Sequence, residues 1–129
     1  MAWIELVSLL ALIQFLVFGA LVGRARGLYG VKAPATTGHE MFERTYRVQM
    51  NTLETLVIFL PAMWLASRYW SPAWVGAVGA VYLLGRVLYA RSYIKDPSSR
   101  SMGYLLSMLP TLALLLAALG GMIKVHLIQ

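Results

Sequence analysis

The chain has 129 residues, of which 60% are hydrophobic and only 12% are charged, and its formal net charge at pH 7 is +6. A mean hydropathy of +0.70 leaves too little polar surface for a soluble domain of this size, so the composition predicts a single membrane domain over residues 1–129. The absence of cysteine excludes disulfides, cysteine–metal sites and a cysteine nucleophile.

Four apolar segments in chain order predict four transmembrane helices, over residues 2–22, 41–67, 73–94 and 101–123. The first segment has no basic leader region, so we interpret it as a retained helix. Residues 23–41 predict a loop, and 68–72 and 95–99 predict short connections. The expected fold class is an all-α integral membrane four-helix bundle.

The second segment carries charges where a membrane helix should be apolar. Residues 55–67 are uncharged but too short to span a bilayer, so the helix must extend backward through the polar run FERTYRVQMNTLETL, residues 42–56. Each ionisable group in a membrane helix costs roughly 2.5–3.5 kcal/mol on insertion scales. A helix that keeps several of them is expected to use them.

Basic residues distinguish the two sides of the membrane. Four helices place both termini on one side, and most Lys and Arg residues lie in or beside the first and third connections. The positive-inside rule therefore predicts that these connections are cytoplasmic and that both termini are outside. This orientation explains the basic charge without a nucleic-acid partner. The residues concerned are Arg24, Arg26, Lys32, Arg44, Arg47, Arg91, Lys95 and Arg100, against Arg68 and Lys124 opposite.

Two helices carry polar stripes. Arg47, Asn51 and Glu54 share one face of the second helix, whereas Gln49 points almost the opposite way, which suits a helix lying between two subunits. The alternative is a buried Arg–Glu pair and an Asn hydrogen bond that lock helices together.

The third helix carries Tyr82, Arg86, Tyr89 and Tyr93 on one stripe. Three hydroxyls beside a guanidinium can all donate hydrogen bonds to an anion. The alternative is an aromatic packing seam in which Arg86 forms a salt bridge with Glu54.

Arg100 is the strongest candidate for chemistry. Asp96 and Pro97 predict the start of the fourth helix, which would place Arg100 about one turn inside it. A guanidinium at a positive helix end stabilises an anion such as a thiolate, and the hydroxyls of Ser98, Ser99 and Ser101 could add to this. The alternative is an interfacial arginine that binds lipid phosphate or orients the chain. His39 and His126 have no metal-ligand spacing, so no metal site is expected.

The residues resemble a known family. The run at 42–56, VYLLGRVLYARSY at 81–93 and RSMGYLLSMLP at 100–110 are similar to the signature of the membrane-associated proteins of eicosanoid and glutathione metabolism, the MAPEG family. The resemblance spans roughly residues 24–110. It implies a homotrimer of four-helix subunits with glutathione bound at each subunit interface. Matched position by position, it implies glutathione contacts at Arg26, Arg47, Gln49, Asn51, Glu54, Arg86, Tyr89 and Tyr93.

The same resemblance implies that Arg100 stabilises the thiolate, that Ser101 is a second thiol-activating group and that Tyr104 lines the substrate pocket. Three departures leave the second substrate open. We place no counterpart in this chain for the aspartate proposed to act in the prostaglandin E synthase branch. The leukotriene C4 synthase branch has a tyrosine where this chain has Thr55, and the prostaglandin E synthase branch has a histidine where it has Tyr89.

The function expected from these residues is a glutathione-dependent transferase or peroxidase for lipophilic substrates, with prostaglandin E synthase-like isomerase chemistry as a variant. A non-catalytic lipid-binding or adaptor protein of the same fold is the alternative. A small transporter or channel subunit is disfavoured because the charges cluster toward one side. The expected partners are glutathione, a lipophilic small molecule, the bilayer and further copies of the chain, and a bacterial inner membrane is favoured over the endoplasmic reticulum.

Overall fold

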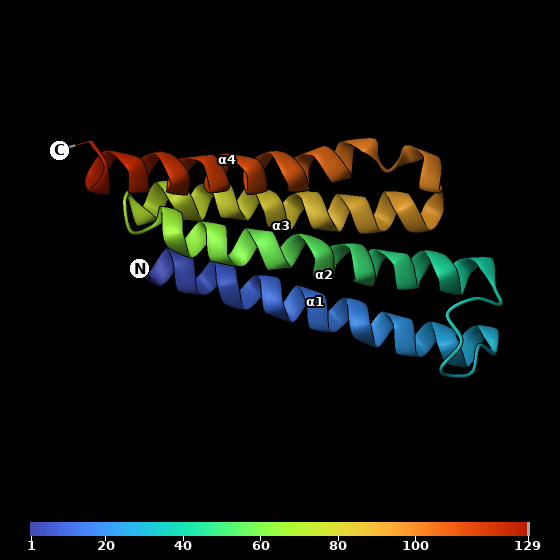
Figure 1. Ribbon diagram of the computed structural model, residues 1–129. Coiled ribbons are helices and arrows are strands. Elements are labelled where there is room, and N and C mark those ends of the chain that lie inside the picture. The colour runs from blue at the N-terminus through green and yellow to red at the C-terminus, as the bar shows by residue number, and fades with distance from the viewer. Residues whose placement is uncertain (129) are drawn as a thin grey trace.

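Four long helices run antiparallel in the computed structural model, which describes residues 1–128 (Figure 1). No strand occurs within that range, so the all-α four-helix prediction is confirmed. The elements are α1 (Ala2–Tyr29), α2 (Glu40–Ala66), α3 (Pro72–Lys95), the 3₁₀ turn η1 (Pro97–Ser99) and α4 (Ser101–His126).

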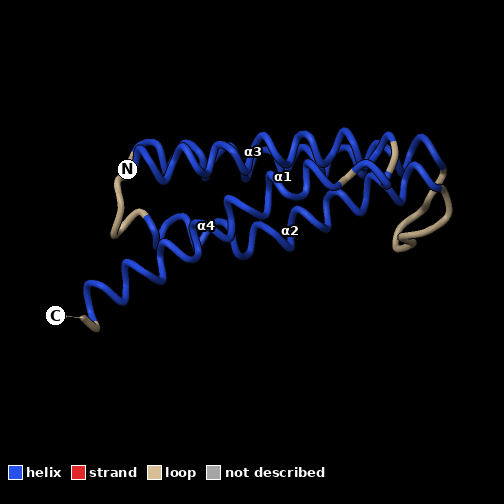
Figure 2. Tube along the Cα trace, turned by 90° about the horizontal axis from the view of Figure 1, so that it is seen from above, coloured by secondary structure: helices blue, strands red, loops and turns tan. Residues whose placement is uncertain are grey.

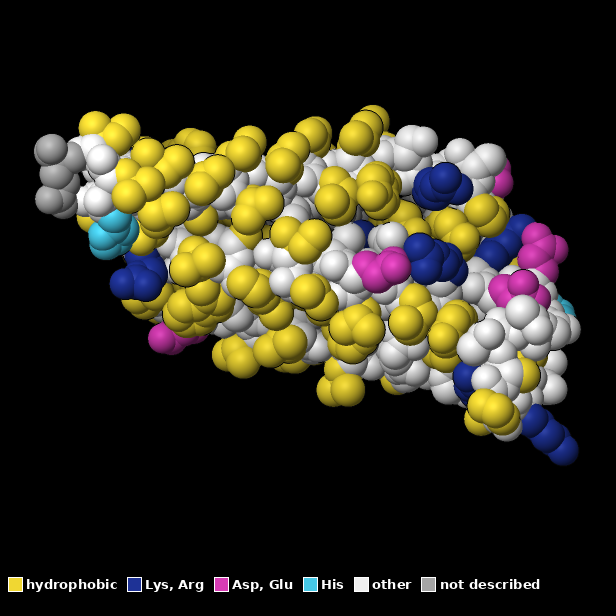
Figure 3. Space-filling model, viewed as in Figure 1, with side chains coloured by type: hydrophobic (Ala, Val, Ile, Leu, Met, Phe, Trp, Pro, Cys, Tyr) yellow, Lys and Arg dark blue, Asp and Glu magenta, His cyan; other side chains and the backbone are white. Residues whose placement is uncertain are grey.

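The two ends of the bundle differ in charge. Both termini and the α2–α3 connection lie at one end, and the α1–α2 loop and the α3–α4 connection lie at the other (Figures 1 and 2). We call the second the basic end because Arg24, Lys32, Arg91 and Lys95 belong to these connections or the helix turns beside them. Figure 3 shows dark blue basic side chains gathered toward this end and yellow apolar side chains across the middle.

All four helices are long and apolar enough to cross a membrane. The shortest, α3, has 24 residues and spans roughly 36 Å at 1.5 Å per residue, more than a hydrocarbon core of about 30 Å. The outward faces are apolar: Leu16, Val57 and Leu84 are 73%, 66% and 66% exposed. Such faces fit a lipid environment and are unfavourable in water.

The helices at both ends of the chain run further than the sequence indicated. Helix α1 continues through Gly23 and Gly27 and ends only at Gly30, whose φ of 68° gives the left-handed C-cap. Helix α4 continues through Gly121 to His126. A Cβ at Gly121 would lie 2.4 Å from the Cβ of Tyr69, so this glycine is required for packing and does not end the helix.

Close contact between helices shapes the core. Gly76 packs on Trp3 of α1, and Gly79 packs on Val7 of α1 and Met63 of α2. In the middle of the bundle the Thr55 hydroxyl lies 2.8 Å from the Tyr82 hydroxyl, and the Tyr82 ring stacks on Phe59.

Helices α3 and α4 are in close contact at two further glycines. A Cβ at Gly85 would lie 2.5 Å from the carbonyl carbon of Leu106, and one at Gly103 would lie 2.3 Å from the Tyr89 backbone nitrogen. Small residues let helix backbones meet in this way. The contact at Gly103 sets the distance between Tyr89 on α3 and Tyr104 on α4.

Candidate functional site

A polar pocket of about 710 Å³ opens between α2, α3 and α4 toward the basic end. Helix α2 contributes one arginine and one asparagine, α3 contributes two tyrosines, and the start of α4 with the residue before it supplies the rest. All the lining residues except Leu105 had been predicted as site residues. The lining is Arg47, Asn51, Tyr89, Tyr93, Arg100, Ser101, Tyr104 and Leu105.

The three tyrosines form one aromatic wall. The Tyr89 ring stacks on Tyr93 with a centroid distance of 5.5 Å and lies 6.3 Å from the Tyr104 ring. Tyr89 is nearly buried, whereas Tyr104 is 39% exposed. The aromatic wall therefore extends from the interior of the bundle to the outer surface of α4. That surface is apolar around Tyr104.

Arg86 lies behind this wall and is fully buried. Its Nη2 donates to Asn51 Oδ1 at 2.8 Å, and its guanidinium lies over the Tyr89 ring at 4.3 Å. Its Nε and Nη1 have no hydrogen-bond partner among the described residues. A buried cation with donors to spare favours an anion or water nearby, because unpaired buried donors are costly.

Glu54 does not pair with Arg86, so the salt bridge expected for an aromatic packing seam is absent. Glu54 instead accepts a hydrogen bond from Arg47 at 3.1 Å along α2. Both side chains are about half exposed, at 58% and 48%. The pair was expected to be buried in the alternative interpretation, and its exposure leaves both charges accessible.

Arg100 lies at the junction of η1 and α4, not one turn inside the helix as predicted. Asp96 caps the 3₁₀ turn through the backbone N–H and hydroxyl of Ser98. The Ser99 hydroxyl donates to the carbonyls of Ser92 and Asp96. Ser98 and Ser99 are therefore used within the turn, and Ser101 is the only one of the three candidate serines in the pocket lining.

The position of Arg100 suits anion binding. It is the N-cap residue of α4, and no side chain caps the free N–H groups of that helix start. The Arg100 side chain makes no hydrogen bond or ion pair within residues 1–128. A guanidinium and the positive end of a helix thus meet at the pocket.

Arg44, which the sequence analysis counted only among the orienting basic residues, joins α2 to the end of α3. Its Nη1 donates to the carbonyls of Ile94 and Lys95, the last two residues of α3, and its Nη2 pairs with Glu40. A cation at a helix C-terminus stabilises the helix dipole. Because the acceptors lie 50 residues further along the chain, no local pattern could have identified them.

Arg26 and Gln49 lie away from the pocket. Arg26 donates to the carbonyls of Ala35 and Val31, and its guanidinium lies over the Phe42 ring. The Gln49 amide nitrogen would lie 3.0 Å from a Cβ at Gly19 of α1. Both residues belong to the α1–α2 side of the bundle, and for Gln49 this agrees with the predicted direction, nearly opposite to Asn51.

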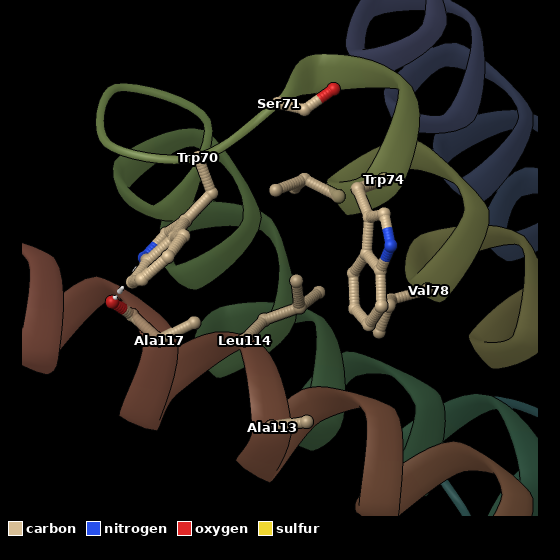
Figure 4. A pocket seen from close by; sticks show the side chains of 8 residues that line it. Trp70, Ser71, Trp74, Val78, Ala113, Leu114 and Ala117 are labelled. Atoms are coloured by element: carbon tan, nitrogen blue, oxygen red, sulfur yellow. Dashed lines mark hydrogen bonds between the residues drawn. The ribbon is translucent and has the colours of Figure 1, made fainter.

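A second cavity, of about 430 Å³, lies at the opposite end of the bundle (Figure 4). Trp70 and Trp74 face each other across it, and Leu114 and Ala113 of α4 line one side. The Trp70 indole donates to the Ala117 carbonyl at 2.8 Å. Its lining is almost wholly apolar and offers no acid, base or nucleophile beyond Ser71.

The charges around the polar pocket favour an anionic ligand. Two arginines line it and a third lies behind it, against the single carboxylate of Glu54. Tyrosine hydroxyls and the Asn51 amide add neutral hydrogen-bonding groups. Among residues 1–128 no group of three or more His, Cys, Asp or Glu side chains is placed to hold a metal ion.

The fold and the pocket define an integral, multi-pass helical membrane protein with a cationic pocket between its helices. A family model described as the MAPEG family matches residues 4–120, and the chain belongs to that family. The family resemblance drawn from the sequence is thereby confirmed.

Three relatives illustrate the similarity. The chain is 48% identical over 117 residues to an uncharacterized protein of Synechocystis sp., covering 91% of this chain and 85% of that protein. It is 39% identical over 115 residues to human microsomal glutathione S-transferase 2, covering 88% and 78%. It is 35% identical over 99 residues to leukotriene C4 synthase of Cavia porcellus, covering 77% and 66%.

Proposed function

We propose that this protein is a membrane-embedded glutathione-dependent transferase or peroxidase, in which Arg100 stabilises the glutathione thiolate. The observation that carries the proposal is that residues from three helices, implied one by one by the family resemblance, line one cationic pocket. The similarity to glutathione S-transferase 2 supports the same class of activity.

Each part of glutathione has a matching group. Its two carboxylates bind guanidinium groups: Arg47 lines the pocket, and the two unpaired nitrogens of Arg86, buried behind the aromatic wall, become accessible when the pocket rearranges on binding. Its ammonium group binds the exposed carboxylate of Glu54. Asn51, Tyr89 and the neighbouring Tyr93 orient the peptide, as the resemblance implies for these positions.

The thiol lies at the start of α4 in this proposal. Arg100 and the helix end lower the thiol pKa, and the Ser101 hydroxyl donates a hydrogen bond to sulfur. In conjugation the thiolate forms a sulfur–carbon bond, the bond to the leaving group breaks, and the thiol proton goes to solvent. In hydroperoxide reduction the thiolate takes one oxygen and releases an alcohol, and a second glutathione then gives the disulfide and water.

The second substrate is lipophilic and enters from the bilayer. Tyr104 lies between the pocket and the apolar outer surface of α4, where Leu105 and Leu109 are 50% and 57% exposed. Holding the electrophile beside the thiolate supplies proximity and an activated nucleophile, which together account for much of the rate of such reactions.

The active form in this proposal is a homotrimer with one glutathione at each subunit interface. Arg26 and Gln49 lie on the α1–α2 side of the subunit, away from the pocket. In a trimer they would complete the pocket of the neighbouring subunit. In this proposal the first and third connections are cytoplasmic, as the positive-inside rule predicts, and glutathione enters from that side.

Arg100→Ala tests the thiolate assignment. At about 4 Å a unit charge contributes roughly 1 kcal/mol in water and 4 kcal/mol near a protein surface. Because Arg100 is exposed, the lower value applies, and the bound thiol pKa is expected to rise by about one unit. The measurement is the ultraviolet absorbance of bound thiolate against pH, with Arg68→Ala at the opposite end as the control.

An unchanged thiolate titration in Arg100→Ala contradicts the role of that residue. If glutathione also fails to raise the thermal unfolding temperature of the unmodified protein, the enzyme proposal is replaced by a non-catalytic lipid-binding or adaptor function. Conjugation of glutathione to an aryl halide by the purified protein supports the transferase.

A further inference from the structure

A second amphipathic site lies on the α1–α3 side of the bundle, away from the polar pocket. Helices α1 and α3 lie together in Figure 2. Between them and the first turns of α2 is a groove of about 500 Å³ toward the basic end. It shares no lining residue with the polar pocket.

The inner part of this α1–α3 groove is apolar. Phe18 and Ala90 are almost fully buried at its base, whereas Leu21 and Val87 are 37% and 46% exposed on its sides. The groove therefore offers apolar surface to a hydrocarbon chain that runs along the helices. An adjoining hollow of about 230 Å³ extends it toward the end of α1 and shares Leu21.

The mouth of the groove is cationic. Arg91 and Lys95 lie one helical turn apart on α3 and line the groove, and Arg24 of α1 lines the adjoining hollow. All three side chains are exposed and form no ion pair within residues 1–128. The carboxylates nearby are engaged elsewhere, since Glu40 pairs with Arg44 and Asp96 binds Ser98.

We propose that the α1–α3 groove binds one anionic phospholipid, with an acyl chain along Leu21 and Val87 and the phosphate between Arg91, Lys95 and Arg24. The groove is apolar toward the middle of the membrane and carries unpaired cations at the basic end. A phospholipid has the same order, with acyl chains toward the membrane interior and a phosphate at the surface. A free phosphate would use only the mouth and leave the apolar part uncovered. A headgroup with its own cation would place a like charge beside these three, so an anionic headgroup is preferred.

The absence of cysteine allows a fluorophore to be attached at one chosen position. Leu84 is 66% exposed on α3, one turn further into the membrane than Val87. The test labels Leu84→Cys in phosphatidylcholine vesicles that contain a small fraction of dibrominated phosphatidylglycerol or dibrominated phosphatidylcholine. Brominated chains quench the label only at short range.

Preferential quenching by the anionic lipid is expected at Leu84→Cys. The preference should fall about fivefold in Arg91→Gln or Lys95→Gln and about twenty-fivefold in the double variant, because each surface cation near an anionic lipid contributes about a fivefold factor. Arg68→Gln, at the end of the bundle opposite the basic end, is the matched control and should keep the preference for the anionic lipid. A label at Leu112→Cys on α4, at similar depth, should show no headgroup preference.

Three results would overturn the proposal. Equal quenching by both lipids at Leu84→Cys indicates ordinary bilayer contact. Full preference in the double variant, whose folding is checked by circular dichroism, removes the role of the cations. Quenching by neither lipid, with disulfide-linked dimers of unlabelled Leu84→Cys on oxidation, shows that a second copy of the chain covers the groove. Glutathione binding is measured separately, so failure here leaves the proposed function untouched.

Discussion

The contact between α3 and α4 at Gly103 gives the sharpest prediction. In Gly103→Ala the new Cβ would lie 2.3 Å from the Tyr89 nitrogen and 2.5 Å from its Cα. Non-bonded atoms of this kind are favourable at about 3.5–4.0 Å. Both clashing atoms belong to the backbone, so no side-chain rotation relieves the contact, and α3 and α4 must separate by roughly 1 Å.

The cost of this separation can be bounded. Overpacking a core typically costs 1–3 kcal/mol, and more when backbones must move. We therefore expect Gly103→Ala to lose about 3 kcal/mol or more of unfolding free energy. For a domain of this size that corresponds to a fall in unfolding temperature of about 10 °C. The same shift moves Tyr104 away from Tyr89, so the polar pocket should also bind glutathione more weakly.

Circular dichroism of the detergent-solubilised protein on heating measures the effect. Gly27→Ala is the matched control, because a Cβ at Gly27 meets nothing within 4 Å and the position is helical. That change should leave stability unchanged or raise it by up to about 1 kcal/mol. Equal unfolding temperatures for Gly103→Ala and the unmodified protein would refute the close α3–α4 packing.

Two further predictions concern charged residues. Arg86→Met should leave the unfolding temperature of the ligand-free protein unchanged or raise it, because two guanidinium nitrogens of Arg86 are buried without partners. The same change should abolish the rise in unfolding temperature that glutathione causes. A large fall in the ligand-free protein would instead mean that Arg86 locks the helices. The Ser98 hydroxyl and N–H hold the pKa of Asp96 below its ordinary value. Asp96→Ala should therefore lower the unfolding temperature at neutral pH, and this difference should vanish as pH falls through the folded-state pKa. A difference that persists in strong acid argues against the Asp96 cap.

Local patterns were sufficient for the helices and for most of the pocket lining. Hydrophobic length indicated four spans, and helical periodicity put Arg47 and Asn51 on one face and Tyr89 and Tyr93 on another. The helix ends were less predictable. Gly23 was predicted to begin the first loop, but α1 continues through it to Tyr29. The fourth helix was predicted to end at residue 123, but it continues to His126, and its Gly121 accommodates Tyr69.

The start of α4 shows why a capping pattern can mislead. Asp96 and Pro97 do begin a helical turn, but it is a 3₁₀ turn that closes on Ser98 and Ser99 before α4 starts. Arg100 is thereby placed at the helix end, where its charge adds to the free N–H groups. Capping residues mark a start locally, but the packing of α3 against α4 decides where the long helix begins.

The sequence by itself determined that this protein spans a membrane four times and keeps polar residues on its second and third helices, because hydrophobic length and side-chain period are properties of a single segment. Only the tertiary structure decided which groups meet. Arg86 pairs with Asn51 and not with Glu54, and Arg44 reaches the carbonyls at the end of α3. These partners depend on how closely the helix backbones approach, and that distance is set by contacts such as Gly103 on Tyr89, between residues on different helices.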